Sequence, residues 1–88
     1  MKKEQPTKIA IITWEDPMTF TGWRSLGKSR AKHGAQTRSV GFLVSEDRDY
    51  VRIALDWNMD GETNGLGVIP RKSVKSMHLI NITPRMLK

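Results

Sequence analysis

The sequence contains no cysteine among its 88 residues, and this absence excludes disulfide bonds, cysteine nucleophiles and thiolate metal sites. Long apolar runs are also missing, since the longest uninterrupted one, Ile9–Ile12, is too short to cross a bilayer or to form a signal peptide. We therefore expect a soluble, cytoplasmic protein. A chain of this length has room for one small domain.

Short runs of β-branched and aromatic residues alternate with polar turns, which predicts an all-β domain with no helix as long as about 10 residues. The expected strands are 8–14, 39–45, 50–57, 66–70 and 74–82. The strongest alternation lies in 39–45 and 50–57, which predict a hairpin, and Arg71–Ser73 predicts a single helical turn. Five short strands in so small a chain predict a five-stranded barrel of the SH3-like or Sm-like kind.

A long loop is expected between the first two strands. The segment Glu15–Arg38 has no clean periodicity and contains three glycines, and unstructured segments of this size are commonly binding elements, lids or disordered excursions. The expected organisation is therefore a flexible arm at 1–7, a single barrel domain at 8–82 and a basic tail at 83–88.

A phosphate-loop pattern occurs in this long loop, because Gly22–Ser29 matches glycine, four residues, then Gly-Lys-Ser. The strand that ends at Asp56 also imitates the metal-binding strand of nucleotide hydrolases. In a genuine site the motif joins a buried parallel strand to a long helix, whereas here Pro17 precedes it and Gly34 follows closely. We therefore attribute the match to chance.

The polar turn after the hairpin resembles the start of a calcium-binding loop. Asp56, Asn58 and Asp60 supply oxygen atoms at alternate positions before Gly61, but Gly67 stands where the loop needs a glutamate. The alternative is a plain hairpin turn shaped by Asp-Gly. We expect no metal and no cofactor, and these three residues remain the candidates for a bound cation.

Catalytic constellations are scarce in this sequence. His33 and His78 are far apart along the chain, and neither belongs to a serine–acid arrangement. The adjacent carboxylates Glu15 and Asp16 follow the first strand, where acidic residues commonly end a strand. We therefore expect that the protein is not an enzyme.

The charge is unevenly distributed, with 15 Lys and Arg against 9 Asp and Glu and a net charge of +6. No acidic residue occurs from Pro17 to Ser45 or after Glu62. If the long loop and the C-terminal segment meet in space, they form a basic surface suited to an anionic partner. The alternative is that these cations only keep a small protein soluble. The candidate anion-binding residues are Arg24, Lys28, Arg30, Lys32, Arg38, Arg71, Lys72 and Lys75.

Aromatic residues lie among these cations. Phe20 and Trp23 could stack on nucleic-acid bases, as aromatic side chains do in proteins that bind single strands. Together with Met18 they could instead anchor a protein interface. A third alternative is that Trp23 packs over the barrel as a lid of the core.

Several short motifs resemble small uncharacterised proteins of tailed bacteriophages and prophages. These motifs are Trp14-Glu15-Asp16, Gly22-Trp23, the strand 39–44, the acidic turn 46–51, and Ile69-Pro70 before Val74. The similarity spans about residues 9–80. It implies a phage accessory protein that acts in the cytoplasm of a bacterial host, and it supplies no catalytic residues.

Two functions from different classes remain open. The first is a non-enzymatic binding protein that engages a nucleic acid or a nucleotide, with an anti-defence sponge for a host nucleotide as one form. The second is an interaction module that binds an acidic or other host protein, or itself, through Met18, Phe20 and Trp23. A homo-oligomer is expected in both cases, because so short a chain buries little core and leaves strand edges open.

Overall fold

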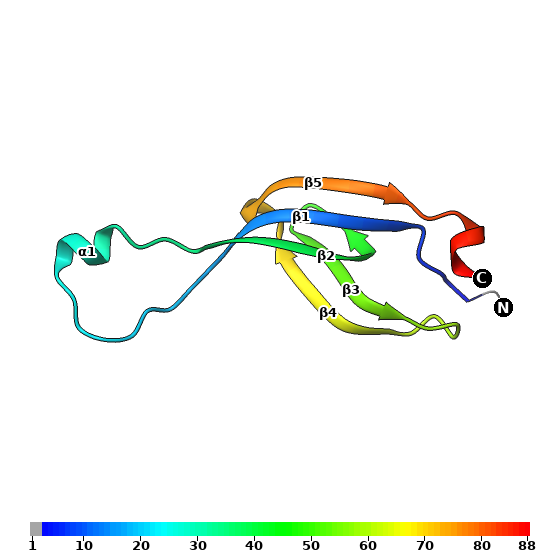
Figure 1. Ribbon diagram of the computed structural model, residues 1–88, viewed down its shortest axis with the longest axis horizontal. Helices are drawn as coiled ribbons and strands as arrows, with labels where there is room; N and C mark the ends of the chain where they lie inside the picture. Colours follow the sequence, from blue (N-terminus) through cyan, green and yellow to red (C-terminus); the bar gives the residue numbers. More distant parts are fainter. Residues whose placement is uncertain (1–2) are drawn as a thin grey trace.

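The computed structural model describes residues 3–88, which form a five-stranded antiparallel sheet with a long projection at one end (Figure 1). The strands are β1 (Lys8–Asp16), β2 (Ala35–Glu46), β3 (Tyr50–Trp57), β4 (Thr63–Pro70) and β5 (Val74–Asn81). A short helix, α1 (Leu26–Arg30), and two 3-10 turns, η1 (Arg71–Ser73) and η2 (Pro84–Leu87), complete the fold. The predicted all-β class, the β2–β3 hairpin and the turn at Arg71–Ser73 are confirmed.

The strand order is β4-β3-β2-β1-β5, so the last strand returns to pair with the first. β4 and β5 are the two edges, and no ladder between them occurs within residues 3–88. The sheet is therefore open, and the closed barrel predicted from the sequence is not confirmed. The edge strands β4 and β5 are neighbours in the chain, joined by η1, so closure depends on how far the whole sheet coils, which the pattern within a single strand does not encode.

Two irregularities bend the sheet. The ladder shifts between Leu43 and Ser45 of β2 and between Thr13 and Trp14 of β1, and such bulges increase strand twist. The turn after β2 reaches η1 where the β3–β4 ladder ends at Tyr50 and Pro70. There the Arg71 backbone N–H donates to the Asp49 carbonyl oxygen at 2.8 Å.

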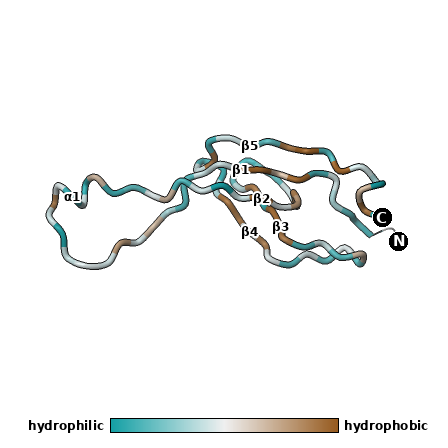
Figure 2. The backbone as a smooth tube through the Cα atoms, viewed as in Figure 1, coloured by the Kyte–Doolittle hydropathy of each residue, from teal (hydrophilic) through white to brown (hydrophobic). Residues whose placement is uncertain are grey.

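The core occupies one face of the sheet and is small. Successive side chains of a strand point to opposite faces, which places alternate residues of β1 and β3 together. The buried cluster is Ala10, Ile12, Val51, Ile53 and Ile69, with Trp14, Leu43, Val74 and Met77 half-buried against it. Hydrophobic colour in Figure 2 is correspondingly concentrated in the strands. Each large aliphatic side chain in this cluster stabilises the fold by about 1.5–3 kcal/mol.

β1 and β2 continue past the end of the β1–β5 ladder as a two-stranded ribbon that pairs Glu15 with Gln36 and Asp16 with Ala35. Residues 17–34, called the arm below, project from this ribbon with α1 near the tip (Figure 1). The molecule accordingly measures 58 × 23 × 21 Å. The predicted loop of 15–38 is therefore too long at both ends. The ribbon lies beyond the core, so its pairing leaves little apolar alternation in the sequence.

The N-terminal segment lies along the β3–β4 turn. Lys3 forms an ion pair with Asp60 at 2.9 Å, and the Trp57 indole N–H donates to the Glu4 carbonyl oxygen at 3.1 Å. Pro6 is buried. The predicted flexible arm at 1–7 thus makes defined contacts from residue 3 onward, and residues 1–2 lie outside the described range. The domain limits 8–82 and 83–88 stay predictions.

Within residues 3–88, no helix has the length and apolar character needed to span a membrane.

The approach of β2 to β3 predicts that Gly41→Ala destabilises the protein. A Cβ at Gly41 would lie 2.8 Å from the Ala54 carbonyl oxygen and 3.3 Å from the Ile53 Cβ atom, so a strand must shift. We expect a loss of about 1–3 kcal/mol in the free energy of unfolding, measured by urea denaturation. Gly27→Ala is the matched control, because a Cβ there meets nothing within 4 Å. Equal urea midpoints for the two variants would contradict the prediction.

Candidate functional site

The arm carries four of the eight candidate cations and is held by local contacts. The Ser25 hydroxyl accepts from the Lys28 backbone N–H at 3.2 Å and caps α1, and the Arg24 guanidinium donates to the Thr21 carbonyl oxygen at 2.7 Å. Lys28 and Arg30 lie in the last turn of α1, where positive charge is favourable. Lys28, Arg30 and Lys32 are exposed, and Arg24 is half-buried.

The two aromatic side chains of the arm differ in environment. The Arg24 guanidinium and the Lys32 ammonium lie over the Phe20 ring, 5.8 and 5.2 Å from its centre, and this ring is 38% exposed. Trp23 is fully exposed, with a relative accessibility of 105%. The alternative that Trp23 is a lid of the core is therefore wrong, because the arm carries this indole away from the sheet. Met18 is exposed as well.

The root of the arm meets the segment that joins β4 to β5. The Gly34 backbone N–H donates to the Glu15 carboxylate at 3.0 Å, which fixes the point where the arm rejoins β2. A shallow hollow beside this contact is lined by Glu15, Pro17, Gly34, Lys72, Ser73 and Lys75. The structure thus brings Lys72 and Lys75 to the base of the basic arm.

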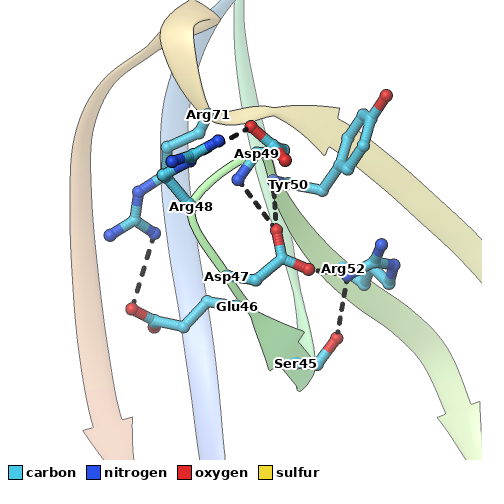
Figure 3. A network of polar contacts seen from close by, with 8 residues as sticks. All are labelled: Ser45, Glu46, Asp47, Arg48, Asp49, Tyr50, Arg52 and Arg71. Carbon is cyan, nitrogen blue, oxygen red and sulfur yellow. Dashed lines mark hydrogen bonds and ion pairs between the residues drawn. The ribbon is translucent and has the colours of Figure 1, made fainter.

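The turn between β2 and β3 holds a polar network close to η1 (Figure 3). The Asp47 carboxylate accepts from the Arg52 guanidinium and the Tyr50 backbone N–H, each at 2.8 Å, and from the Asp49 N–H at 2.9 Å. The hydrogen bond from Arg52, with the two backbone bonds, lowers the pKa of Asp47 from 3.8 to about 2. Asp47 therefore stays charged and shapes the turn at all ordinary pH values.

A second hollow opens beside this turn. Its lining consists of Arg48, Asp49, Tyr50, Pro70, Arg71 and Lys72. The Arg52 guanidinium lies over the Tyr50 ring at 5.3 Å from its centre, and the ring is 42% exposed. The sequence analysis missed Arg48 and Tyr50. The charged turn beside an aromatic residue is visible in the sequence, but its proximity to Lys72 depends on strand pairing.

Two of the predicted anion-binding residues are placed less favourably than the others. Arg38 lies on β2 opposite Thr13 and outside both hollows. Arg71 lines the second hollow, but its guanidinium also pairs with the Glu46 carboxylate at 3.4 Å. Six candidates therefore form the arm and its root, and two lie beside them.

The phosphate-loop motif has no phosphate-loop geometry. Gly22–Ser29 lies within the arm, and the helix that follows has five residues. The Lys28 backbone N–H, which would face a phosphate in such a loop, donates to the Ser25 hydroxyl instead. The attribution to chance agrees with these contacts.

The side-chain oxygen atoms of the calcium candidates already interact with other groups of the protein. The Asn58 side-chain oxygen accepts from the backbone N–H groups of Asp60 and Glu62, at 3.0 and 2.9 Å. Asp60 pairs with Lys3, and Asp56 lies 3.5 Å from the Asn64 amide. Across residues 3–88, no group of three His, Cys, Asp or Glu side chains is placed to hold a metal.

The two histidines lie on different elements. In the arm, the His33 Nδ1 atom is 2.6 Å from the Gly34 carbonyl oxygen. His78 is on the edge strand β5, opposite Ile11.

Comparisons with known proteins give no relative: no protein-family model matches the chain, and no curated protein or solved structure is significantly similar to it. The resemblance to phage proteins stays a prediction.

The environment of Asp47 predicts a pH dependence of stability. Because its folded pKa of about 2 lies below the unfolded value of 3.8, protonation favours the unfolded chain. The stabilisation is present above the unfolded pKa and is lost as the pH falls through the folded pKa. Asp47→Asn should therefore reduce the fall in Tm across this acidic window, measured by thermal unfolding at a series of pH values.

Ser45→Ala is the control for this series. It removes the other side-chain acceptor of Arg52, at 3.3 Å, and leaves the Asp47 carboxylate in place. Its Tm should fall with pH as in the wild type. A wild-type pH profile for Asp47→Asn would contradict the assignment.

Proposed function

We propose that the protein is a non-enzymatic binding protein that engages an anionic partner, a nucleic acid, through the basic arm and its root. The observation that supports this proposal is the placement of Lys72 and Lys75 beside an arm free of acidic residues. Potential from several cations on one projection adds up and attracts phosphate groups.

The arm cations are free to meet a ligand. The ion pairs found within residues 3–88 involve Lys3, Arg48, Arg52 and Arg71, and none of them involves a cation of the arm. A nucleic-acid strand that binds there would therefore exchange water and counterions for protein contacts without breaking ion pairs within the protein. A nucleotide sequestered by an oligomer is the alternative cargo for the same surface.

The proposal includes a finer description of the fold. An SH3-like or Sm-like barrel is supported by the return of β5 to β1 and by the two bulges that bend the sheet. The open edges β4 and β5 favour self-association, as edge strands do in general. A phage origin and a site of action in the host cytoplasm belong to the same proposal and rest on the resemblance of the motifs.

Salt dependence tests the nucleic-acid proposal. The dissociation constant of a labelled single-stranded oligonucleotide, measured by fluorescence anisotropy, should rise steeply with salt, by about 0.7 in the log–log slope per phosphate contact. Arg30→Glu and Lys32→Glu should weaken binding whatever the base sequence. Arg85→Glu is the matched control, because η2 lies at the opposite end of the molecule from the arm (Figure 1). A flat salt response, or an equal effect of Arg85→Glu, would overturn the proposal.

A protein partner is the second candidate, and the full exposure of Trp23 favours it. Aromatic side chains dominate the energetics of protein interfaces. Met18 and Phe20 would extend the anchor on the same arm.

Trp23→Ala separates a binding role from a structural one. The side chain is fully exposed, so its removal should change the free energy of unfolding by no more than about 0.5 kcal/mol, as is usual for surface substitutions. The Tm should therefore stay close to that of the wild type. Under the second candidate, the variant no longer captures the host protein that the wild type captures. A large fall in Tm would show that Trp23 packs in the fold.

A further inference from the structure

We propose that the site is an extended track for a single-stranded nucleic acid several nucleotides long, running from the arm across η1 to Arg48 and Tyr50. This inference rests on the proposed function and assigns to it a form of ligand and two further residues. Arg48 and Tyr50 lie 14 and 16 residues beyond the end of the arm in sequence, and the pairing of Tyr50 with Pro70 brings them beside η1.

The track consists of three shallow hollows, each of which shares a lining residue with the next. The hollow at Arg48 and Tyr50 shares Lys72 with the hollow at the root of the arm. The root hollow in turn shares Gly34 with a third hollow on the arm, which Phe20 and Lys32 help to line. A linear ligand can therefore follow neighbouring depressions from one end to the other.

Each end of the track has an aromatic ring with one or more cations over its face. At the arm, cations lie 5.2 and 5.8 Å from the centre of the Phe20 ring, and at the turn Arg52 lies 5.3 Å from the centre of the Tyr50 ring. Both rings are partly exposed, at 38% and 42%. Aromatic faces accept unstacked bases of any sequence, and the cations beside them contact the backbone.

Positive charge continues between the two rings. Lys72 and Lys75 line the root hollow, and Arg48 is almost fully exposed beside the second hollow, with a single long contact of 3.9 Å to Asp49. A mononucleotide would use one ring and one hollow, whereas the shared lining residues connect all three. A base-paired duplex keeps its bases stacked on each other and cannot use the rings in this way. The arrangement therefore favours an unpaired strand.

Two acidic side chains, Glu15 and Asp49, lie along the track. The Glu15 carboxylate is occupied by the Gly34 N–H at 3.0 Å. Asp49 lies beside Arg48, and its side chain would repel a phosphate that passes there. Removal of this charge should therefore tighten binding, an effect that loss of structure would not produce.

The experiment measures the dissociation constants of fluorescein-labelled oligothymidylates of about 4 and about 16 nucleotides by anisotropy, at several salt concentrations. For the longer probe, Tyr50→Ala should weaken binding about 5-fold to 150-fold, the effect expected of one stacked base. Arg48→Glu should reduce its log–log salt slope by about 0.7. Asp49→Asn should tighten binding, and Tyr50→Phe, which keeps the ring, should match the wild type.

The controls separate the track from the proposed function on which it rests. Arg85→Glu should not change the affinity, and Tm is recorded for every variant so that unfolded protein is recognised. If Lys32→Glu weakens the longer probe while the Arg48, Asp49 and Tyr50 variants leave it unchanged, the arm binds alone and the track is wrong. Equal affinity for a duplex of the same length would also overturn it. If no probe binds in a salt-dependent way, the proposed function itself fails.

Discussion

The pairing of β1 with both β2 and β5 is the constraint on which the rest of the structure depends. β1 is apolar on both faces from Ile9 to Ile12, so alternation alone does not select its register. The register is selected instead by the pairing of two small residues, Ala10 and Gly41. At Gly41 a β3 carbonyl comes so close that a side chain would not fit, and this position lies opposite the fully buried Ala10.

That register also decides where the arm leaves the sheet. With Ala10 opposite Gly41, Asp16 falls opposite Ala35, and Glu15 comes within reach of the Gly34 N–H. A Cβ at Gly34 would lie 2.5 Å from the Asp16 carbonyl oxygen, so a residue without a side chain is needed at this junction. The direction of the arm is thus fixed by the same ladder that organises the core.

The sequence predicts those elements that have one face on the core. Val51 and Ile53 alternate with Arg52 because their strand is half-buried, and the hairpin is therefore recognisable. The ribbon was missed because Glu15 and Gln36 lie beyond the core, where neither face of the ribbon has to be apolar. Openness of the sheet was missed for another reason, since it depends on how far all five strands coil together and not on the alternation within one strand.

The site divides in the same way. The arm cations are visible as a stretch without acidic residues, whereas the position of Arg48 beside Lys72 follows from the pairing of Tyr50 with Pro70. In the sequence, Arg48 stands among acidic residues whose negative charges outnumber its positive charge. In the fold, Asp47 is paired with Arg52, so Arg48 is less neutralised than its neighbours in the sequence suggest.

Distance determines which charges act together. Screening lengths at physiological salt are about 8 Å, and the molecule is 58 Å long. The acidic β3–β4 turn, with Asp60 and Glu62, lies at the end opposite the arm, so it hardly weakens the potential there (Figure 1). A phosphate near the arm therefore experiences the local cations and not the average net charge of +6. Local charge rather than total charge therefore orients such a ligand before contact.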